Sequence, residues 1–261
     1  MFINVVLCQL RVGLEISLAE KIHIFKNKPD FVCLPEYFLI PPESKDYSEY
    51  ASRFDYNLKL LARWSDELDT TFMGGTIIEK SNSLMYNTCF IFRKGQKIAS
   101  YRKCFPTEKE QARGITPGRR NMVFEVEGVR VGILICADVL HEEVFQKMRR
   151  MNADIIFVPT VSPLLENDSL QDKAQRDSDI FVRGAEISRA YVVKTCGLGT
   201  IFGKPQNGRS LVAAPWGIIW QVSPEAEQNP RIQTQLLDIE ELREFRRAVM
   251  IREVVKQIKL D

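Results

Sequence analysis

The stretch Val129–Asp138, with the sequence VRVGILICAD, constrains the fold more than any other part of the chain. Its β-branched and apolar residues are typical of a strand that is covered on both faces. Gly128 fits a turn before the strand, and Gly132 indicates a place where another backbone comes close. Cys136 stands where the apolar run stops, and Ala137-Asp138 then begins a polar turn into a helix. The stretch therefore predicts a buried strand that ends by presenting one thiol.

Strand ends of this kind occur at two further places. Glu36 follows Pro35 directly after the short apolar run Phe31–Leu34, and Lys103 follows a strand-like run that ends at Arg102. In open α/β sheets, residues at the carboxyl ends of strands are placed to do chemistry. Each residue also has an ordinary interpretation, because free cysteines are usually packing residues and most glutamates and lysines are solvated. Single positions leave both interpretations open.

Taken together, the order Glu36, Lys103, Cys136 resembles the nitrilase, or carbon–nitrogen hydrolase, superfamily. Members of that superfamily carry a Glu-Lys-Cys triad in this order and act mostly on amides and related C–N bonds. The resemblance covers nearly the whole chain. The matching segments are Leu34-Pro35-Glu36, Tyr101-Arg102-Lys103, Pro117-Gly118, Gly132–Asp138, Ala153–Pro159 and Arg183–Glu186.

The resemblance implies a role for each residue of the triad. Cys136 is expected to be the nucleophile, which is active as a thiolate. Glu36 is expected to move protons as the general base and acid, a task that needs a carboxyl pKa raised by burial. Lys103, with a backbone N–H just after Cys136, is expected to stabilise the oxyanion of the tetrahedral intermediate.

Further residues of the site are expected around the triad. Family members carry a second glutamate shortly before a Pro-Gly pair, and both Glu108 and Glu110 fit this position. Glu110 is favoured as the residue that orients Lys103 or contacts substrate. Ala137 and Thr160 follow two of the predicted strands and are also expected to support the site or contact substrate. No metal ligands and no cofactor are implied.

The resemblance implies an α/β fold, a four-layer αββα sandwich in which two mainly β sheets pack face to face with helices on both outer faces. The alternation of helical and strand patterns along the chain agrees with this architecture. Residues 1–261 are expected to form a single carbon–nitrogen hydrolase domain. A homodimer or larger homo-oligomer is implied as well.

Composition excludes several classes of partner. The chain has 261 residues, 45% of them hydrophobic, and a formal net charge of +2. Acidic and basic residues are interspersed, so no basic stripe indicates nucleic acid. No apolar run approaches the roughly 20 residues that a membrane span needs. The N-terminal MFINVV lacks a basic segment before its apolar run, so it is interpreted as a first strand and not as a signal peptide. The spacing of the six cysteines fits neither a zinc site nor a CxxC motif, which favours reduced thiols in the cytoplasm.

Hydrophobic periodicity predicts the following elements beyond the central strand. Strands are expected at 2–10, 31–34, 72–78, 84–92, 97–102, 122–126, 154–158, 191–195, 209–214, 217–222 and 232–237. Helices are expected at 14–26, 55–68, 142–151, 172–189 and 240–259. Residues 104–121 and 197–208 are expected to be loops. Arg183 and Glu186 lie three apart on a predicted helix and are expected to pair. The last helix has an apolar seam of Phe245, Val249 and Val254 that suits contact with a partner subunit.

Alternative mechanisms and functions remain open at this point. A cysteine–histidine hydrolase would have to use His23 or His141, both of which suit surface or capping positions better. Nitrile-cleaving members of the superfamily commonly have Trp-Glu after the nucleophile, whereas this chain has Ala137-Asp138, which favours a small carboxylic amide. An N-carbamoyl compound is the second candidate substrate. The non-hydrolase alternatives are a catalytically silent binding or scaffold protein and a redox-sensing thiol at Cys136.

Overall fold

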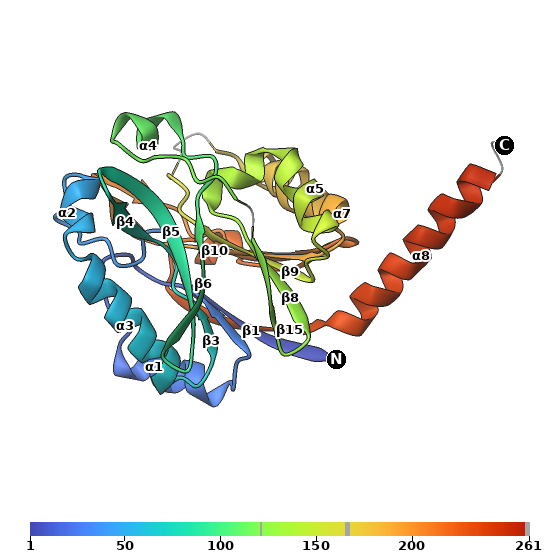
Figure 1. Cartoon of the computed structure of the whole chain (residues 1–261), viewed down its shortest axis with the longest axis horizontal. Coiled ribbons are helices and arrows are strands. Elements are labelled where there is room, and N and C mark those ends of the chain that lie inside the picture. The colour runs from blue at the N-terminus through green and yellow to red at the C-terminus, as the bar shows by residue number, and fades with distance from the viewer. Residues whose placement is uncertain (121, 165–167, 259–261) are drawn as a thin grey trace.

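The computed structural model of the protein describes residues 1–120, 122–164 and 168–258, and most of its strands form two mixed sheets (Figure 1). The first sheet has the order β15-β1-β2-β3-β5-β4, with β6 paired to β5. Its strands are β1 (Phe2–Gln9), β2 (Phe31–Cys33), β3 (Thr71–Met73), β4 (Ile77–Ser81), β5 (Leu84–Arg93), β6 (Gln96–Arg102) and β15 (Arg231–Asp238).

The second sheet has the order β14-β13-β10-β9-β8-β7. Its strands are β7 (Val123–Val126), β8 (Val129–Ile133), β9 (Ile155–Thr160), β10 (Tyr191–Cys196), β13 (Leu211–Ala214) and β14 (Gly217–Gln221). A separate hairpin is made of β11 (Gly199–Ile201) and β12 (Lys204–Gln206).

Several of the helices cover the outer faces of the two sheets. The helices of the described residues are α1 (Leu18–Lys26), α2 (Tyr47–Ala51), α3 (Phe54–Glu67), α4 (Glu108–Ala112), α5 (Glu142–Arg150), α6 (Leu170–Asp177), α7 (Arg183–Ser188) and α8 (Ile239–Ile258). Helices α1 and α3 pack on the first sheet, and α5 and α7 pack on the second (Figure 1). The four-layer αββα sandwich expected from the sequence is therefore confirmed. No helix within the described ranges is long and apolar enough to cross a bilayer.

The apolar core between the two sheets explains the continuous apolar runs. In β1, Val5 and Leu7 point into this inner core, while Val6 and Cys8 point to the layer beneath α1 and α3. The two-residue period of a strand sends successive side chains to opposite faces, and here both faces are buried. The stretch that ends at Cys136 behaves in the same way.

Parallel strands of both sheets end at the same side of the molecule. Strands β1, β2 and β3 run parallel in the first sheet, as do β8, β9 and β10 in the second. Just beyond β1 and β10, Leu198 N donates to Leu10 O at 2.9 Å and Val12 N donates to Leu198 O at 2.9 Å. These bonds join the carboxyl ends of the two parallel sets, so the segments that follow β2 and β8 emerge together.

Several expected elements differ from the structure. The single strand expected at 72–78 is divided at Gly74-Gly75 into β3 and β4, which pair one after the other with the same edge of β5, while β6 pairs with its other edge. The expected loop 104–121 contains α4, and its Asn121 lies outside the described residues. The expected loop 197–208 contains the β11–β12 hairpin. Short elements escape periodicity arguments because they span too few residues to show a period.

The long helix expected at 172–189 is confirmed as a continuous helical run over 170–188. A π-helical turn at Ser178–Val182 lies inside this run, between α6 and α7. The expected pair of Arg183 with Glu186 does not form, because the Arg183 guanidinium donates to Glu142 of α5 at 2.9 Å instead. Both members of that ion pair are largely exposed, so it adds little stability.

Helix α8 begins in the inner core and then leaves the body of the molecule. Ile239 and Leu242 are buried there, and the rest of the helix projects past the two sheets (Figure 1). Of the expected apolar seam, Phe245 packs against Trp216 with ring centroids 5.5 Å apart. Lys259 and the side chain of Val254 lie outside the described part of the structure. The proposed contact with a partner subunit stays a prediction.

Two buried glycines, Gly184 of α7 and Gly132 of β8, give a paired test of the packing of α5 against its neighbours. A methyl group on Gly184 would lie 2.4 Å from the rigid ring of Phe145, whereas one on Gly132 would meet the flexible Met148 sulfur at 2.7 Å. The atom nearest to this position of Gly132 belongs to the side chain of Met148, so the expectation that another backbone comes close to Gly132 was wrong. We predict that Gly184→Ala lowers the free energy of unfolding by about 1–3 kcal/mol and Gly132→Ala by less than about 1 kcal/mol. Urea unfolding measures both, and equal losses would contradict this description of the packing.

Candidate active site

Four of the residues expected from the sequence share one pocket. The pocket has a volume of about 510 Å³ and contains Glu36, Lys103, Glu110 and Cys136. Its other lining residues are Tyr37, Tyr47, Thr107, Glu108, Lys109, Arg113, Val161, Pro163, Ile201, Phe202, Lys204 and Gln206. The lining joins segments that follow β2, β6, β8 and β9, so both sheets contribute to it.

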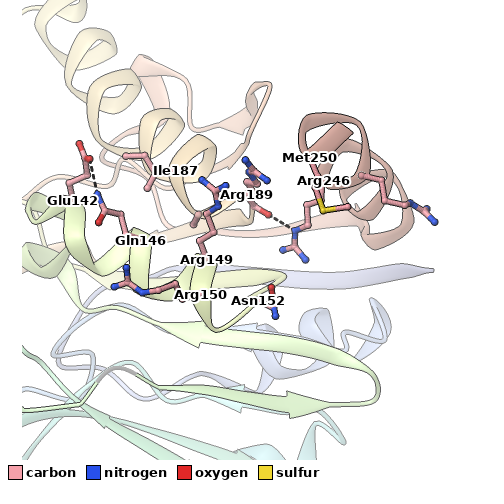
Figure 2. Close-up of a pocket in the computed structure, with 11 residues that line it drawn as sticks. Glu142, Gln146, Arg149, Arg150, Asn152, Ile187, Arg189, Arg246 and Met250 are labelled. Atoms are coloured by element: carbon pink, nitrogen blue, oxygen red, sulfur yellow. Dashed lines mark hydrogen bonds between the residues drawn. The ribbon is translucent and has the colours of Figure 1, made fainter. Parts of the chain in front are cut away.

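A larger cavity of about 730 Å³ lies between α5, α7 and α8 (Figure 2). Five arginines are among its described lining residues, and four of them, Arg149, Arg189, Arg246 and Arg247, already form salt bridges. Arg246 donates to Asp154 at 2.7 Å and to the Arg189 carbonyl at 2.7 Å, and Arg189 pairs with Glu253. No cysteine is among its described lining residues. We therefore take the smaller pocket, which holds the thiol, as the candidate active site.

Cys136 occupies a strained turn between β8 and a 3-10 turn at Cys136–Leu140. Its φ of +44° lies in the left-handed region, which non-glycine residues rarely adopt and which is often found at functional sites. The Sγ atom lines the pocket and donates to Val161 O at 3.3 Å. Burial raises the pKa of the thiol, the charge of Glu36 raises it further, and the charge of Lys103 opposes both. The thiol is therefore neutral until a neighbouring base removes its proton.

The buried carboxylate of Asp138 holds this turn in place. It accepts hydrogen bonds from the backbone N–H of Ile135 at 2.9 Å and from that of Phe105 at 2.8 Å, and from the Tyr101 hydroxyl at 2.9 Å. Tyr101 and Phe105 flank Lys103 in the chain. Asp138 thus fixes the Cys136 turn to the segment that carries Lys103. The sequence indicated only a polar turn here, and nothing in the spacing pointed to this role.

Glu36 is fully buried just beyond β2. Gly75 makes room for it, because a Cβ atom at that position would lie 2.0 Å from the Pro35 carbonyl oxygen. Glu36 Oε1 accepts from Lys103 Nζ at 2.9 Å and from Asn87 Nδ2 at 2.8 Å, and Oε2 accepts from Val161 N at 3.3 Å. Burial raises the pKa of this carboxyl above its ordinary value, although the charge of Lys103 works against the increase.

Lys103 is also buried, and it donates to two carboxylates. Its Nζ lies 2.9 Å from Glu36 Oε1 and 2.9 and 2.8 Å from the two oxygens of Glu110. These contacts use the three N–H donors of the ammonium group. Burial alone would lower the pKa of the ammonium, but the charges around it, Glu36 first, raise its pKa well above the ordinary value. Lys103 therefore stays charged.

The backbone of Lys103 is fixed on both sides. Its N–H donates to Asn87 O at 2.9 Å, and its carbonyl accepts from Gly118 N at 2.7 Å. A Cβ atom on Gly118 would lie 2.2 Å from the Arg102 carbonyl oxygen, so only glycine allows this approach. The Pro117-Gly118 pair noted in the sequence therefore supports the lysine segment.

The structure distinguishes the two candidate second glutamates. Glu110 is buried and bonded to Lys103. Burial acts to raise the pKa of Glu110, but the charge of Lys103 and the hydrogen bonds that Glu110 accepts together hold that pKa below its ordinary value. Glu108 is exposed at the pocket mouth. Glu110 also forms a capping box with Thr107, in which Thr107 N donates to Glu110 Oε2 at 2.7 Å. The Thr-x-x-Glu pattern of that box was present in the sequence and could have identified Glu110.

Asn87 and Tyr37 are site residues that the sequence did not reveal. The Asn87 amide lies 2.8 Å from Glu36, 2.8 Å from the Tyr37 hydroxyl and 3.2 Å from Glu110. The Tyr37 hydroxyl donates to Glu110 in turn. The available signal was a buried polar residue in the middle of the apolar strand β5, since such residues are usually held by specific partners.

Other expected residues lie outside the pocket lining. Ala137 and Thr160 are buried, and the Thr160 hydroxyl donates back to Val158 O at 2.9 Å. His23 is exposed on α1, and His141 stacks on Phe105 with centroids 3.8 Å apart. Neither histidine is among the described lining residues. Over the same described ranges, no group of three or more His, Cys, Asp or Glu residues could hold a metal ion.

Comparison with proteins of known sequence gives a consistent result. A family model described as "Carbon-nitrogen hydrolase" matches residues 13–247. An omega-amidase NIT2 of Xenopus tropicalis is 25% identical over 239 residues, which cover 85% of this chain and 81% of the relative. The human omega-amidase NIT2 is 25% identical over 238 residues, which cover 84% of this chain and 80% of the relative.

Solved structures show the same fold at lower identity. A carbon–nitrogen hydrolase from Helicobacter pylori G27 aligns with a TM-score of 0.81 and 17% identity, covering 95% of this chain and 93% of the other. A mutant of an amidase from Nesterenkonia sp. AN1 aligns with a TM-score of 0.74 and 16% identity, covering 96% of both chains. In that mutant, the acetamide moiety of fluoroacetamide is added covalently at the active-site cysteine. From the match over residues 13–247, the chain belongs to the carbon–nitrogen hydrolase family.

Proposed function

We propose that this protein hydrolyses a non-peptide C–N bond of a small carboxylic amide and releases ammonia or an amine, through a thioester on Cys136. The observation that carries the proposal is the burial of Glu36 and Lys103 beside Cys136 in one pocket. Two kinds of relative support the same chemistry. One is named an omega-amidase, and the other is an amidase modified at its cysteine.

Acylation begins with proton transfer from the thiol to Glu36. A carboxylate with a raised pKa is a better base than an ordinary glutamate, and Glu36 lines the same pocket as Cys136. The thiolate sulfur then attacks the amide carbonyl carbon, and the carbonyl π electrons move to the oxygen. Glu36 next gives its proton to the amide nitrogen. The C–N bond breaks, ammonia or an amine leaves, and the acyl group stays on the sulfur as a thioester.

Lys103 stabilises the oxyanion in this scheme because its hydrogen bonds change during the reaction. All three of its donors face carboxylate oxygens before the reaction. When Glu36 takes the thiol proton it loses its charge, and its attraction for the ammonium weakens. One N–H of Lys103 then becomes available to the oxyanion. The Ala137 backbone N–H, in the first turn after Cys136, is the second donor.

Deacylation repeats these steps with water. The ionised Glu36 takes a proton from a water molecule, and the resulting hydroxide attacks the thioester carbon. The tetrahedral intermediate collapses to the carboxylic acid and expels the thiolate, which regains its proton from Glu36. Glu110 takes part indirectly, because its bonds to Lys103 keep the ammonium in position throughout the cycle.

Replacement of the nucleophile tests the proposal. We predict that Cys136→Ala lowers ammonia release from a responsive amide by roughly 10⁴-fold or more while the fold is kept. Ammonia release from a panel of small amides, N-carbamoyl compounds and nitriles is the measurement, with circular dichroism as the check on folding. Cys104→Ala is the matched control, since Cys104 is the other thiol that is not fully buried. Near-normal turnover in Cys136→Ala would end the hypothesis.

The pH dependence tests the role of Glu36. Because Glu36 must be ionised to accept the thiol proton, kcat/KM should fall as the pH decreases through its raised pKa. Asn87→Leu removes a donor to the ionised form, so we predict that the acid limb of the profile moves to higher pH by roughly one unit. Asn57→Leu, a change at another buried asparagine, is the matched control. An unmoved or lowered acid limb would show that Glu36 is not the titrating group.

A histidine variant separates the two cysteine mechanisms. His141→Ala should change kcat by less than about threefold, because the imidazole stacks on Phe105 and does not line the pocket. In a cysteine–histidine enzyme, loss of the general base costs about 10²-fold or more. Steady-state kinetics on the best amide of the panel decides between these outcomes.

A further inference from the structure

A buried ionic cluster lies outside the candidate active site, and the proposed reaction does not use it. Its members are Lys173 and Asp177 of α6, Lys194 of β10, Arg209 and Glu227. All but the half-buried Lys173 are buried, and none of the five is among the described lining residues of the pocket. Breaking a buried ion pair leaves an uncompensated charge, so groups that are bonded to such a cluster are held in one place.

Glu227 connects this cluster to Asn207, which is also buried. The Oε2 atom of Glu227 accepts from Lys173 Nζ at 2.6 Å and from Asn207 Nδ2 at 2.9 Å. The backbone carbonyl of Glu227 accepts from Gly208 N at 2.9 Å, and a Cβ atom on Gly208 would lie 2.6 Å from that oxygen. The Oδ1 atom of Asn207 accepts from Gln228 Nε2 at 2.7 Å. Both ends of the Asn207 amide are therefore fixed.

The backbone of Asn207 begins a strand pairing that leads into the pocket. Its N–H donates to Ser162 O at 2.6 Å. The next residue after that serine, Pro163, bridges Gln206 of β12 in antiparallel register. A second backbone hydrogen bond, 3.0 Å long, closes the pairing on the other side of the bridge. The segment that follows Val161 is therefore held against β12.

Val161 itself lies between the two groups that exchange a proton in the proposed mechanism. Its N–H donates to Glu36 Oε2 at 3.3 Å, and its carbonyl accepts from Cys136 Sγ at 3.3 Å. The N–H favours the ionised form of Glu36, because a hydrogen bond to the charged form of a group stabilises that form. The carbonyl fixes the direction of the thiol. A displacement of Val161 would therefore act on the base and on the nucleophile together.

We propose that Asn207 and Glu227 are positioning residues for the reaction at Cys136. Through the backbone of Ser162, they keep Val161 in place between the base and the thiol. Neither of the two is among the described lining residues of the pocket. Asn207 makes the backbone contact, and Glu227 ties it to the ionic cluster. This role rests on the proposed amide hydrolysis, but the geometry can be measured without turnover.

A charge-neutral change at Asn207 tests the role in turnover of the best amide of the panel. Asn207→Leu removes both side-chain hydrogen bonds, so Val161 is held less firmly. We predict that kcat falls roughly tenfold, because small displacements of reacting groups are costly. The acid limb of kcat/KM should also move to higher pH by roughly half a unit, because Glu36 loses a donor to its ionised form.

The matched control for this variant is Ser210→Ala. It removes a buried hydroxyl that accepts from Cys196 N at 2.9 Å, and it leaves the contacts of Asn207 in place. The control should keep the wild-type acid limb. An equal shift in both variants, or no shift in Asn207→Leu, would overturn the proposal. If circular dichroism shows that Asn207→Leu does not fold, Asn207→Ser, which removes the same bonds without added bulk, takes its place.

An exchange of side chains tests the link to Glu227. Asn207→Asp places two carboxylates together and should lower kcat by roughly tenfold, because their repulsion displaces the segment. The double variant Asn207→Asp, Glu227→Gln again has one amide and one carboxylate, with the amide N–H now donated from position 227. It should recover kcat to within about threefold of the wild type, since the hydrogen bond and the charge are both restored. No recovery would overturn the role of Glu227.

Alkylation of Cys136 separates this proposal from the catalytic one. Iodoacetamide reacts with the thiolate, so peptide mass spectrometry gives the rate at Cys136 as a function of pH without amide turnover. Asn207→Leu should move the acid limb of this profile to higher pH by roughly half a unit. Such a shift supports the positioning role even if the wild type hydrolyses no amide of the panel, an outcome that would count against amide hydrolysis alone. A limb that is absent or unmoved would overturn the positioning role, and the hydrolase proposal would still stand if Cys136→Ala abolished turnover of an amide.

Discussion

The buried ammonium of Lys103 is the interaction on which the candidate site depends. Removing a charge from water is costly unless partners replace the solvent, and Lys103 has three such contacts with Glu36 and Glu110. Two carboxylates share one cation, so the cluster carries one excess negative charge while both are ionised. That excess is relieved when Glu36 takes a proton. In the proposed mechanism, the arrangement that stabilises the buried lysine therefore also prepares Glu36 to act as a base toward Cys136.

The site is rigid because side chains and close backbone contacts join segments that are distant in the sequence. Asp138 fixes the Cys136 turn to the segment that carries Lys103, and Gly118 supports that segment from its other side. Val161 links the two sheets at the pocket, since its N–H donates to Glu36 and its carbonyl accepts from Cys136. The amide of Asn87 fills the space between the carboxylates. These groups take no part in the proposed reaction, but the loss of any of them would disturb the geometry of Glu36, Lys103 and Cys136.

Much of this could be predicted from the chain itself, for physical reasons that differ between elements. The long strands follow from continuous apolar runs that end in polar residues. The αββα layers and the grouping of Glu36, Lys103 and Cys136 were implied by the resemblance to the carbon–nitrogen hydrolase superfamily, and apolar runs alone do not determine them. Helix α4 and the π-helical turn between α6 and α7 are too short or too local to show a period. The roles of Asp138 and Asn87 depend on contacts across 33 and 51 residues of chain, which spacing arguments do not reveal. Glu110 had a local signal in its capping box with Thr107.

The most direct test of the account is the mass of the protein caught during turnover. An amide reaction is quenched with acid at a series of times, and the masses of the intact protein and its peptides are measured for the wild type and for Glu36→Gln, in which acylation and hydrolysis both lack their base. The account predicts that the mass of the acyl group is added to the peptide that contains Cys136 in the wild type and that Glu36→Gln forms this adduct far more slowly. An acyl group on a different residue, or steady ammonia release while the Cys136 peptide stays unmodified at every time, would contradict it.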